Sequence, residues 1–343
     1  AHPGSAMAPR HDASCDSSPA KKRFCTAIPC HACVSAGGTT IAPPGLTILD
    51  GGMGHQLKAM GIEISGPVGS QRRFLGVATA NTEKPDVVRD AHLAYIDAGA
   101  GVVTTNSYAC VPKCLELADD EETKAEGSLE KLVEAAGKCA RAAVDARPGC
   151  KVAIAGCLPP LAESYRPDRV GPFDENLAHY RTIAKVISQY ADVLLCETMS
   201  TVDEARAACT AALETGLPVW VAWTLDELKP VLRSGESIED AVGAIAKLPG
   251  AEAQLQACLF NCTSPEIIVT AMPMLREAAP DHVRIGAYAN GFLTASSGCG
   301  EYRDLGCSEY RDGFAKKWIE SGATVVGGCC GVFPRHIEAI KAG

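Results

Sequence analysis

The sequence has no apolar run of the roughly 20 residues that a helix needs to cross a bilayer, so we predict no membrane span. Basic residues are not in excess either: 32 Lys and Arg against 41 Asp and Glu give a formal net charge of −9. This balance argues against a nucleic-acid binder. A phosphate-binding turn is also missing, because Asp50-Gly51-Gly52-Met53-Gly54 does not match the G-x-G-x-x-G spacing of dinucleotide-binding folds.

Cysteine, in contrast, is abundant, with 17 residues in a chain of 343. A chain of this length, 47% hydrophobic and 21% charged, can bury a large core and needs no disulfide staples. The cysteines are spread through predicted helices and strands without a convincing secretory signal, which fits a reducing compartment. We therefore interpret them as free thiols and expect a cytoplasmic protein, or an organellar one if the N-terminal segment is a transit-peptide remnant.

Residues 1–45 differ in composition from the rest of the chain. They are rich in Ala, Ser, Pro and Cys and show neither helical nor strand periodicity. We predict a disordered or targeting-like tail here and assign residues 46–343 to a single domain. A small zinc knuckle is the alternative, because Cys30 and Cys33 form a Cys-x-x-Cys pair, but further ligands at suitable spacing are poor.

From Leu46 onward, short apolar strands alternate with amphipathic helices. The helices are recognised by apolar residues that recur at intervals of three and four, as in Pro85–Ala98. This rhythm predicts a single (β/α)₈ TIM-type barrel, an α/β fold, rather than a doubly wound sheet. The expected strands are residues 46–50, 102–105, 151–155, 192–196, 218–223, 254–260, 283–288 and 324–326.

In a barrel of this kind the active site lies at the carboxyl ends of the strands. The residues expected at those ends are mostly carboxylates, carboxamides and thiols, namely Asp50, Asn106, Glu197, Thr224, Asn261, Cys262, Asn290, Cys329 and Cys330. An arbitrary barrel would not gather so many polar and reactive side chains at one rim. We therefore place the candidate site there.

Three of these cysteines form a candidate metal site. Cys329 and Cys330 follow an apolar strand and two glycines, and Cys262 ends another apolar run. Neighbouring cysteines do not easily form an unstrained disulfide with each other, but both can bind one soft metal ion. Three thiolates would leave the fourth position of a tetrahedral zinc ion open, as in catalytic sites. The bland alternative is that all three are small buried core residues.

Four segments of the domain together resemble the homocysteine S-methyltransferase family. They are Leu49-Asp50-Gly51-Gly52-Met53-Gly54, Cys196-Glu197-Thr198, Asn261-Cys262 and Gly327-Gly328-Cys329-Cys330-Gly331. The resemblance covers about residues 46–343. It implies a methyltransferase in which one zinc ion, held by Cys262, Cys329 and Cys330, serves the transfer of a methyl group to the thiol of homocysteine, giving methionine.

The same resemblance assigns roles to other residues of the rim. Asp50 and Glu197 resemble the family's acidic residues in the substrate pocket, where a carboxylate pairs with the substrate ammonium; we count Glu197 with the catalytic set. The backbone N–H groups of Gly51 and Gly52 can approach the substrate carboxylate, because glycine has no side chain. The predicted pocket is completed by Tyr108, Asn261, which also orients the Cys262 turn, and Asn290. For each of these residues an ordinary turn, loop or core role is the alternative.

We expect the methyl donor to be a cation. A centre of thiolates attracts positive charge, and a dry pocket screens that attraction less. An aromatic face such as that of Tyr108 also attracts a methylated cation. Family members that use betaine have a Tyr directly after the Glu that Glu197 resembles, where this chain has Thr198. We therefore favour a sulfonium, S-methylmethionine or S-adenosylmethionine, over betaine.

Three alternatives stay open. Selenocysteine could replace homocysteine as the acceptor, because a selenolate binds zinc in the same position. A fourth protein ligand such as Cys299 could close the site and make the chain a non-catalytic zinc-binding barrel. The barrel could also catalyse a different reaction and use its cysteines structurally.

In addition, we expect the loop Leu158–Pro172, rich in Pro and charged residues, to cover the site as a lid.

Overall fold

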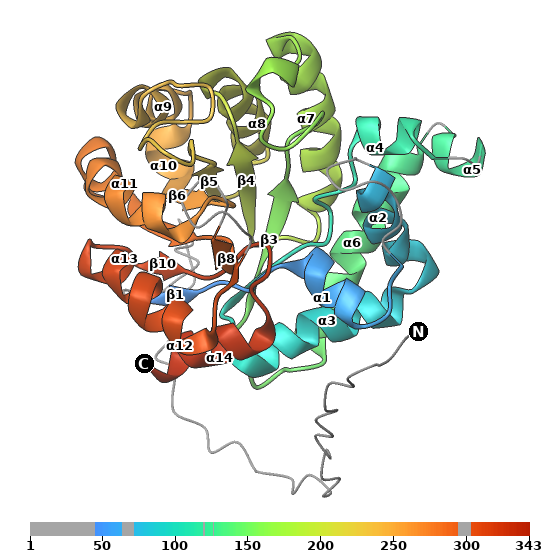
Figure 1. The fold of residues 1–343 in the computed structure, drawn as a ribbon. Coiled ribbons are helices and arrows are strands. Elements are labelled where there is room, and N and C mark those ends of the chain that lie inside the picture. Colours follow the sequence, from blue (N-terminus) through green and yellow to red (C-terminus); the bar gives the residue numbers. More distant parts are fainter. Residues whose placement is uncertain (1–44, 64–71, 119–120, 126, 294–302) are drawn as a thin grey trace, which may run out of the picture. The chain divides into compact units, whose positions relative to one another are not determined.

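An eight-stranded parallel sheet forms the centre of the structure, a computed structural model (Figure 1). Residues 45–63, 72–118, 121–125, 127–293 and 303–343 are described. The predicted tail before Gly45 and the alternative ligand Cys299 lie outside these ranges, so what we expect of them stays a prediction.

The strands follow one another around a barrel in chain order. Their bounds are β1 (Thr47–Ile48), β2 (Val102–Thr104), β3 (Ala153–Leu158), β4 (Val193–Met199), β5 (Val219–Trp223), β6 (Leu255–Asn261), β7 (Arg284–Tyr288) and β10 (Val325–Val326). From β2 to β10 each of these strands pairs in parallel with the next, and β10 pairs in parallel with β1. A parallel bridge between Leu49 and Val102 joins β1 to β2 and closes the circle. The predicted (β/α)₈ barrel is confirmed.

Helices connect successive strands and surround them (Figure 1). The predicted helices are observed as α3 (Pro85–Ala98), α6 (Ser128–Asp145), α7 (Phe173–Ile187), α8 (Val202–Leu213), α9 (Ile238–Ala246), α11 (Pro265–Ala278), α12 (Cys307–Tyr310), which continues through the π-helical turn Arg311–Ala315 into α13 (Lys316–Glu320), and α14 (Pro334–Ala342). Within the described ranges, none of the helices has the length and apolar character that crossing a bilayer requires.

The segment between β1 and α3 holds two helices that the sequence-based prediction missed, α1 (Met53–Ala59) and α2 (Arg72–Glu83). They carry few large apolar residues, because α1 buries only Leu57 and α2 is built largely from small and polar residues. Several short elements were also not predicted: α4 (Pro112–Glu116), α5 (Glu121–Lys124), the 3₁₀ turn Pro167–Arg169, α10 (Ala251–Gln254), and the hairpin of β8 (Phe292–Leu293) and β9 (Arg303–Asp304).

The core has two layers, because the side chains of each strand point alternately into the barrel and out toward the helices. Both layers are buried, which explains why the strands read as nearly continuous apolar runs. The inner layer consists of Leu49, Val102, Ala155, Val193, Leu195, Trp220, Ala222, Ala257, Leu259, Tyr288 and Val325. These side chains fill the interior of the barrel, so polar groups gather at its ends.

We expect Gly286→Ala to destabilise the barrel. Gly286 in β7 pairs with Val325 in β10, and a Cβ atom on it would lie 2.0 Å from the Val325 backbone oxygen. Two paired strands cannot separate without losing hydrogen bonds, so we expect the free energy of unfolding to fall by about 1–3 kcal/mol in urea denaturation. Gly243→Ala in α9 is the control. No atom lies within 4 Å of a Cβ placed there, so this variant should be unchanged or slightly more stable. Equal stability of both variants would contradict close packing of β7 against β10.

Candidate active site at the carboxyl ends of the strands

Three cysteine side chains meet at the carboxyl end of the barrel. Cys262 directly follows β6, whereas Cys329 and Cys330 follow β10 after two glycines. The Cys262 sulfur lies 2.8 Å from that of Cys329 and 3.8 Å from that of Cys330. All three sulfur atoms lie within 4.8 Å of one another. The structure thus brings together the three predicted metal ligands from two distant segments of the chain.

The backbone beside these thiols has room only for glycine. A Cβ atom on Gly327 would lie 2.5 Å from the Leu49 Cβ, and one on Gly328 would lie 2.0 Å from a methyl carbon of Val332. On the facing segment, a Cβ on Gly52 would lie 2.6 Å from the Cys329 carbonyl oxygen. The turn that carries Cys329 and Cys330 is therefore pressed against the end of β1.

The backbone N–H of Gly52, which was predicted to contact the substrate carboxylate, already has a hydrogen-bond acceptor in the structure. Its N–H group donates a 2.9 Å hydrogen bond to the carbonyl oxygen of Val332, so a substrate carboxylate would have to displace that carbonyl. Gly51 lies equally close to its surroundings, because a Cβ on it would lie 2.4 Å from the same Val332 oxygen. Both glycines thus serve close packing of the two segments, and their contact with a substrate stays a prediction.

The proximity of the three sulfur atoms also divides their proton affinities. Hydrogen bonds from Cys262 and Cys329 hold the pKa of the Cys330 thiol well below its ordinary value. The hydrogen bond between Cys329 and Cys262 acts in the opposite direction on Cys329 and raises its pKa. A cluster that shares a negative charge in this way favours one thiolate before any metal binds.

Two buried carboxyl groups lie near the thiols. Asp50 accepts hydrogen bonds from the backbone N–H of Thr104 at 2.7 Å and from its hydroxyl at 3.1 Å. Glu197 accepts one from the Tyr288 hydroxyl at 3.2 Å. Burial, which disfavours a charged carboxylate, raises the pKa of Asp50 to about 8 and that of Glu197 to about 7. A cation placed between them would restore both negative charges, so the pair suits an ammonium group.

Asn261 links the ends of β4 and β6. Its side-chain oxygen accepts a 2.9 Å hydrogen bond from the backbone N–H of Thr198, and its amide nitrogen donates to the Thr198 hydroxyl at 2.8 Å. This double contact holds the turn after Glu197 beside the turn that carries Cys262. The arrangement fits the orienting role expected of Asn261, whereas its contact with a substrate stays a prediction.

Backbone strain is concentrated at this end of the barrel. Among the described residues, the non-glycine residues with positive φ are Tyr165 at 64°, Thr198 at 62° and Cys262 at 52°. Residues with a side chain rarely adopt this region, which costs of the order of 1–3 kcal/mol each. Such conformations persist only where neighbouring contacts enforce them. The gathering of all three residues around the thiols therefore supports a functional role for this end of the barrel.

Two tyrosines lie beside the thiols. The hydroxyl of Tyr108, the residue predicted from the sequence, lies 2.7 Å from the Ser164 hydroxyl. The ring of Phe74 in α2 lies 6.4 Å from the Tyr108 ring. The hydroxyl of Tyr165, which was not predicted, lies 2.8 Å from the Cys262 sulfur. Ser164 and Tyr165 both belong to the loop expected to act as a lid, so this loop touches the site at two consecutive residues.

The other predicted rim residues have mixed surroundings. Asn106 donates to the Val77 carbonyl oxygen and to the Asn81 side chain, which ties it to α2. The Thr224 hydroxyl donates to the carbonyl oxygen of Cys262 at 3.3 Å. Asn290 is 5% exposed, and its side-chain oxygen is buried without a hydrogen-bond partner among the described residues. An unpaired buried acceptor costs roughly 1–3 kcal/mol, which makes this oxygen a candidate to accept a substrate N–H group.

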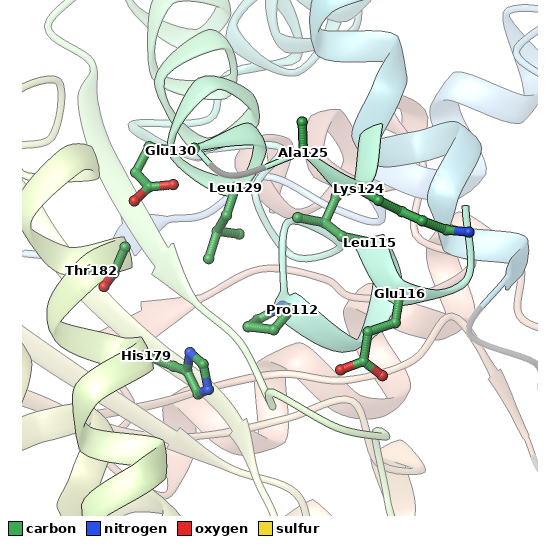
Figure 2. Close-up of a pocket in the computed structure, with 10 residues that line it drawn as sticks. Pro112, Leu115, Glu116, Lys124, Ala125, Leu129, Glu130, His179 and Thr182 are labelled. Atoms are coloured by element: carbon green, nitrogen blue, oxygen red, sulfur yellow. The ribbon is translucent and has the colours of Figure 1, made fainter. Parts of the chain in front are cut away.

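An open cavity of about 600 Å³ lies elsewhere, among the helices α4 to α7 (Figure 2). In Figure 2 the side chains of His179 and Thr182 on α7 face those of Pro112, Glu116 and Leu129. No residue of the thiol cluster and no predicted site residue lines this cavity. The candidate active site is therefore the thiol cluster with its carboxyls and tyrosines, not the cavity.

The sequence and the fold are similar to those of known proteins. The curated homocysteine S-methyltransferase of Escherichia coli (strain K12) is 27% identical over 308 residues, covering 87% of this chain and 94% of that protein. A selenocysteine methyltransferase of Astragalus bisulcatus is 26% identical over 322 residues, covering 85% of this chain and 90% of that protein. Among solved structures, the metallated homocysteine methyltransferase MmuM from Escherichia coli has the same fold, with a TM-score of 0.70 and 24% identity over 87% of this chain and 96% of that one.

The family model described as Homocysteine S-methyltransferase matches residues 47–343, which include both cysteine segments, both buried carboxyls and every strand of the barrel. The match to relatives with this name covers 94% of the length of the Escherichia coli protein and 94% of that of the Zea mays protein. With the fold and the family model in agreement, the chain belongs to the homocysteine S-methyltransferase family.

Proposed function

We propose that this protein transfers a methyl group from a cationic donor to the thiolate of homocysteine and so forms methionine. The observation that carries the proposal is the meeting of Cys262, Cys329 and Cys330 at the end of the barrel where such enzymes act. Relatives named homocysteine S-methyltransferase, among them those of Escherichia coli and Zea mays, support this acceptor.

We infer that the three thiols hold one zinc ion. Thiolate sulfur is a preferred zinc ligand at about 2.3 Å, which places tetrahedral sulfur ligands about 3.8 Å apart. The Cys262–Cys330 separation of 3.8 Å fits this value, and the Cys262–Cys329 separation of 2.8 Å must widen by about 1 Å, within reach of a side-chain rotation. The bound ion would supply one thing, a position in which a substrate thiol is deprotonated and stays nucleophilic.

The chain's own residues would orient the amino-acid part of homocysteine. We assign Asp50 and Glu197 to the substrate ammonium, because both are buried and an added cation stabilises their charged forms. The unpaired oxygen of Asn290 would accept a further N–H group. Gly51 and Gly52 let the substrate carboxylate approach the backbone, in competition with the Val332 carbonyl.

For the donor we favour a sulfonium over betaine. The ring of Tyr108 lies at the site with Phe74 beside it and would attract a methylated cation. At Thr198 no aromatic ring is present, and its hydroxyl and backbone are both bound to Asn261. S-methylmethionine and S-adenosylmethionine are the candidates.

Selenocysteine is the second candidate acceptor. A relative named selenocysteine methyltransferase is 26% identical to this chain, against 27% for the homocysteine S-methyltransferase of Escherichia coli. A selenolate carries the same charge as a thiolate and would occupy the same position. The amino-acid pocket of Asp50 and Glu197 would serve either acceptor.

The donor assay tests the whole proposal. Reduced, zinc-loaded protein is given homocysteine with S-methylmethionine, S-adenosylmethionine or betaine, each in a separate reaction, and methionine is measured. We expect methionine with a sulfonium and none with betaine. Turnover with betaine alone would contradict the donor assignment. No turnover with any donor, despite one bound zinc, would favour another acceptor such as selenocysteine, or a non-catalytic zinc protein.

We expect Cys262→Ala, Cys329→Ala and Cys330→Ala each to lose zinc and methionine formation together, because two thiolates cannot hold the ion tightly enough for turnover. Metal content after dialysis and activity are measured on the same samples. Cys209→Ala is the control: Cys209 is a fully buried thiol in α8, outside the cluster, so its loss should leave one zinc per chain and full activity. Full activity in any of the first three variants would refute the ligand set.

Glu197→Gln should lower kcat/KM for homocysteine by about 10²-fold, because a buried ammonium would lose a charged partner. In the parent protein, pKa values of about 7 for Glu197 and about 8 for Asp50 mean that both carboxyls become protonated as the pH falls, so kcat/KM should fall on the acid side. Glu204→Gln is the control and should keep the parent's pH profile. Burial raises the pKa of Glu204 to about 7 as well, but this residue lies in the first turn of α8 and accepts a hydrogen bond from the backbone N–H of Ser200, ahead of that helix. A Glu197→Gln variant with the parent's kcat/KM and acid limb would contradict the role of Glu197.

A further inference from the structure

Tyr165 reaches the thiol cluster from the loop between β3 and α7. The other residues of the cluster come from the ends of strands, whereas Tyr165 is the seventh residue after Leu158, the last residue of β3. Its hydroxyl lies 2.8 Å from the Cys262 sulfur, a distance at which the phenol can donate a hydrogen bond. One phenol thus contacts one of the three proposed metal ligands.

The ring of Tyr165 is packed against Arg233. The guanidinium carbon of Arg233 lies 4.6 Å from the centre of the Tyr165 ring. Arg233 is itself held by an ion pair with Glu227, in which the two side chains are 18% and 14% exposed, and by a 3.1 Å hydrogen bond to the Thr224 hydroxyl. A guanidinium so fixed over an aromatic ring restrains the ring as well as attracting it.

The same support also reaches the turn that carries Cys262. Glu227 accepts a 3.1 Å hydrogen bond from the backbone N–H of Ser264, and the Thr224 hydroxyl donates to the carbonyl oxygen of Cys262 at 3.3 Å. The groups that hold the phenol are therefore the groups that hold the cysteine. Sulfur and hydroxyl are fixed relative to each other through one connected network.

The conformation of the loop shows that this contact is enforced. Tyr165 has a φ of 64°, a region that is sterically unfavourable for a bulky side chain. Ser164, one residue earlier, is bonded to the Tyr108 hydroxyl at 2.7 Å. Two consecutive side chains thus anchor the loop to the site, and Tyr165 keeps its hydroxyl at the Cys262 sulfur together with this unfavourable φ.

We propose that Tyr165 is a positioning residue of the metal centre: its hydroxyl donates a hydrogen bond to the sulfur of Cys262, and Arg233 keeps it there. The inference rests on the proposed zinc site. A hydrogen bond to a ligand thiolate stabilises its negative charge and fixes the direction of its lone pairs. Partners of this kind typically change metal affinity 10- to 100-fold.

The test compares Tyr165→Phe with the parent protein after loading with Co²⁺. Thiolate-to-cobalt charge-transfer absorption reports on the ligand sulfur directly and needs no turnover. We expect the variant to bind one Co²⁺ and its band to move to longer wavelength, because the Cys262 sulfur becomes richer in electrons. Zinc affinity, measured by competition with a chromophoric chelator, should fall about 10- to 100-fold.

Two further variants sharpen the comparison. Tyr180→Phe removes a fully buried phenol of α7 that donates a 3.0 Å hydrogen bond to the carbonyl oxygen of Pro159. Pro159 belongs to the same loop as Tyr165, but this contact does not involve the thiol cluster. The cobalt spectrum and the zinc affinity should therefore equal those of the parent. Arg233→Lys keeps a charge for Glu227 but loses the planar stack on Tyr165. It should shift the band and the affinity in the same direction by a smaller amount, and it carries the test if Tyr165→Phe does not fold.

Parent-like absorption and zinc affinity in the metal-loaded Tyr165→Phe variant, or in Arg233→Lys where that variant carries the test, would overturn the proposal. A phenolate-to-cobalt band in the parent that vanishes in Tyr165→Phe would overturn it too, because Tyr165 would then be a ligand itself. If the parent binds no metal, the proposed zinc site fails and this inference with it. Metal content separates that outcome from the other two.

Discussion

The contact between the ends of β1 and β10 is the constraint on which the site depends. Leu49 donates a 2.7 Å backbone hydrogen bond to Val326, and Gly328 donates one of 3.0 Å to Asp50. These bonds join the first strand of the barrel to the last, and they hold the turn that carries Cys329 against the backbone at Asp50. Because a side chain at Gly327 or Gly328 would collide with Leu49 or Val332, closure of the barrel and position of the thiols cannot be varied separately. The glycines before the cysteines are thus needed for the candidate metal site as much as for the fold.

The second side of the site is held by strain that its neighbours balance. Thr198 and Cys262 both have positive φ, and Asn261 bonds to Thr198 while preceding Cys262 in the chain. One amide therefore stabilises two unfavourable turns, at roughly 1–3 kcal/mol of strain each. A relaxed turn after β6 would point the Cys262 side chain elsewhere. The strain is best understood as the cost of aiming one sulfur at two others that come from a different strand.

Much of this could be predicted from the sequence, because barrel strands are apolar runs and the residue after such a run lies at the carboxyl end. Cys262 and Glu197 were identified for that reason, and β4 and β6 end where expected within a few residues. Tyr165 and Arg233 could not be identified in this way. Both lie in loops whose conformation depends on contacts with other loops. No spacing in the sequence predicts that the Tyr165 hydroxyl will contact the Cys262 sulfur, or that Arg233 will pack on the Tyr165 ring. The sequence also contains no sign that the Val332 carbonyl would accept a hydrogen bond from the N–H of Gly52, because the two residues lie at opposite ends of the domain in sequence.

The charges of the buried carboxyls and thiols determine which substrates the site favours. Burial disfavours the charged form of Asp50 and of Glu197, and this is the main reason why the pKa of each carboxyl is raised. In the proposed reaction an amino-acid acceptor would bring an ammonium group that permits the carboxyls to ionise, and the thiolates would attract a cationic donor. Transfer of the methyl group to a thiolate cancels one negative and one positive charge at the reacting atoms, so a poorly solvated pocket favours the products. Burial disfavours ionised carboxyls at this site, and for the same reason it would favour the proposed methyl transfer, which removes charge from the reacting atoms.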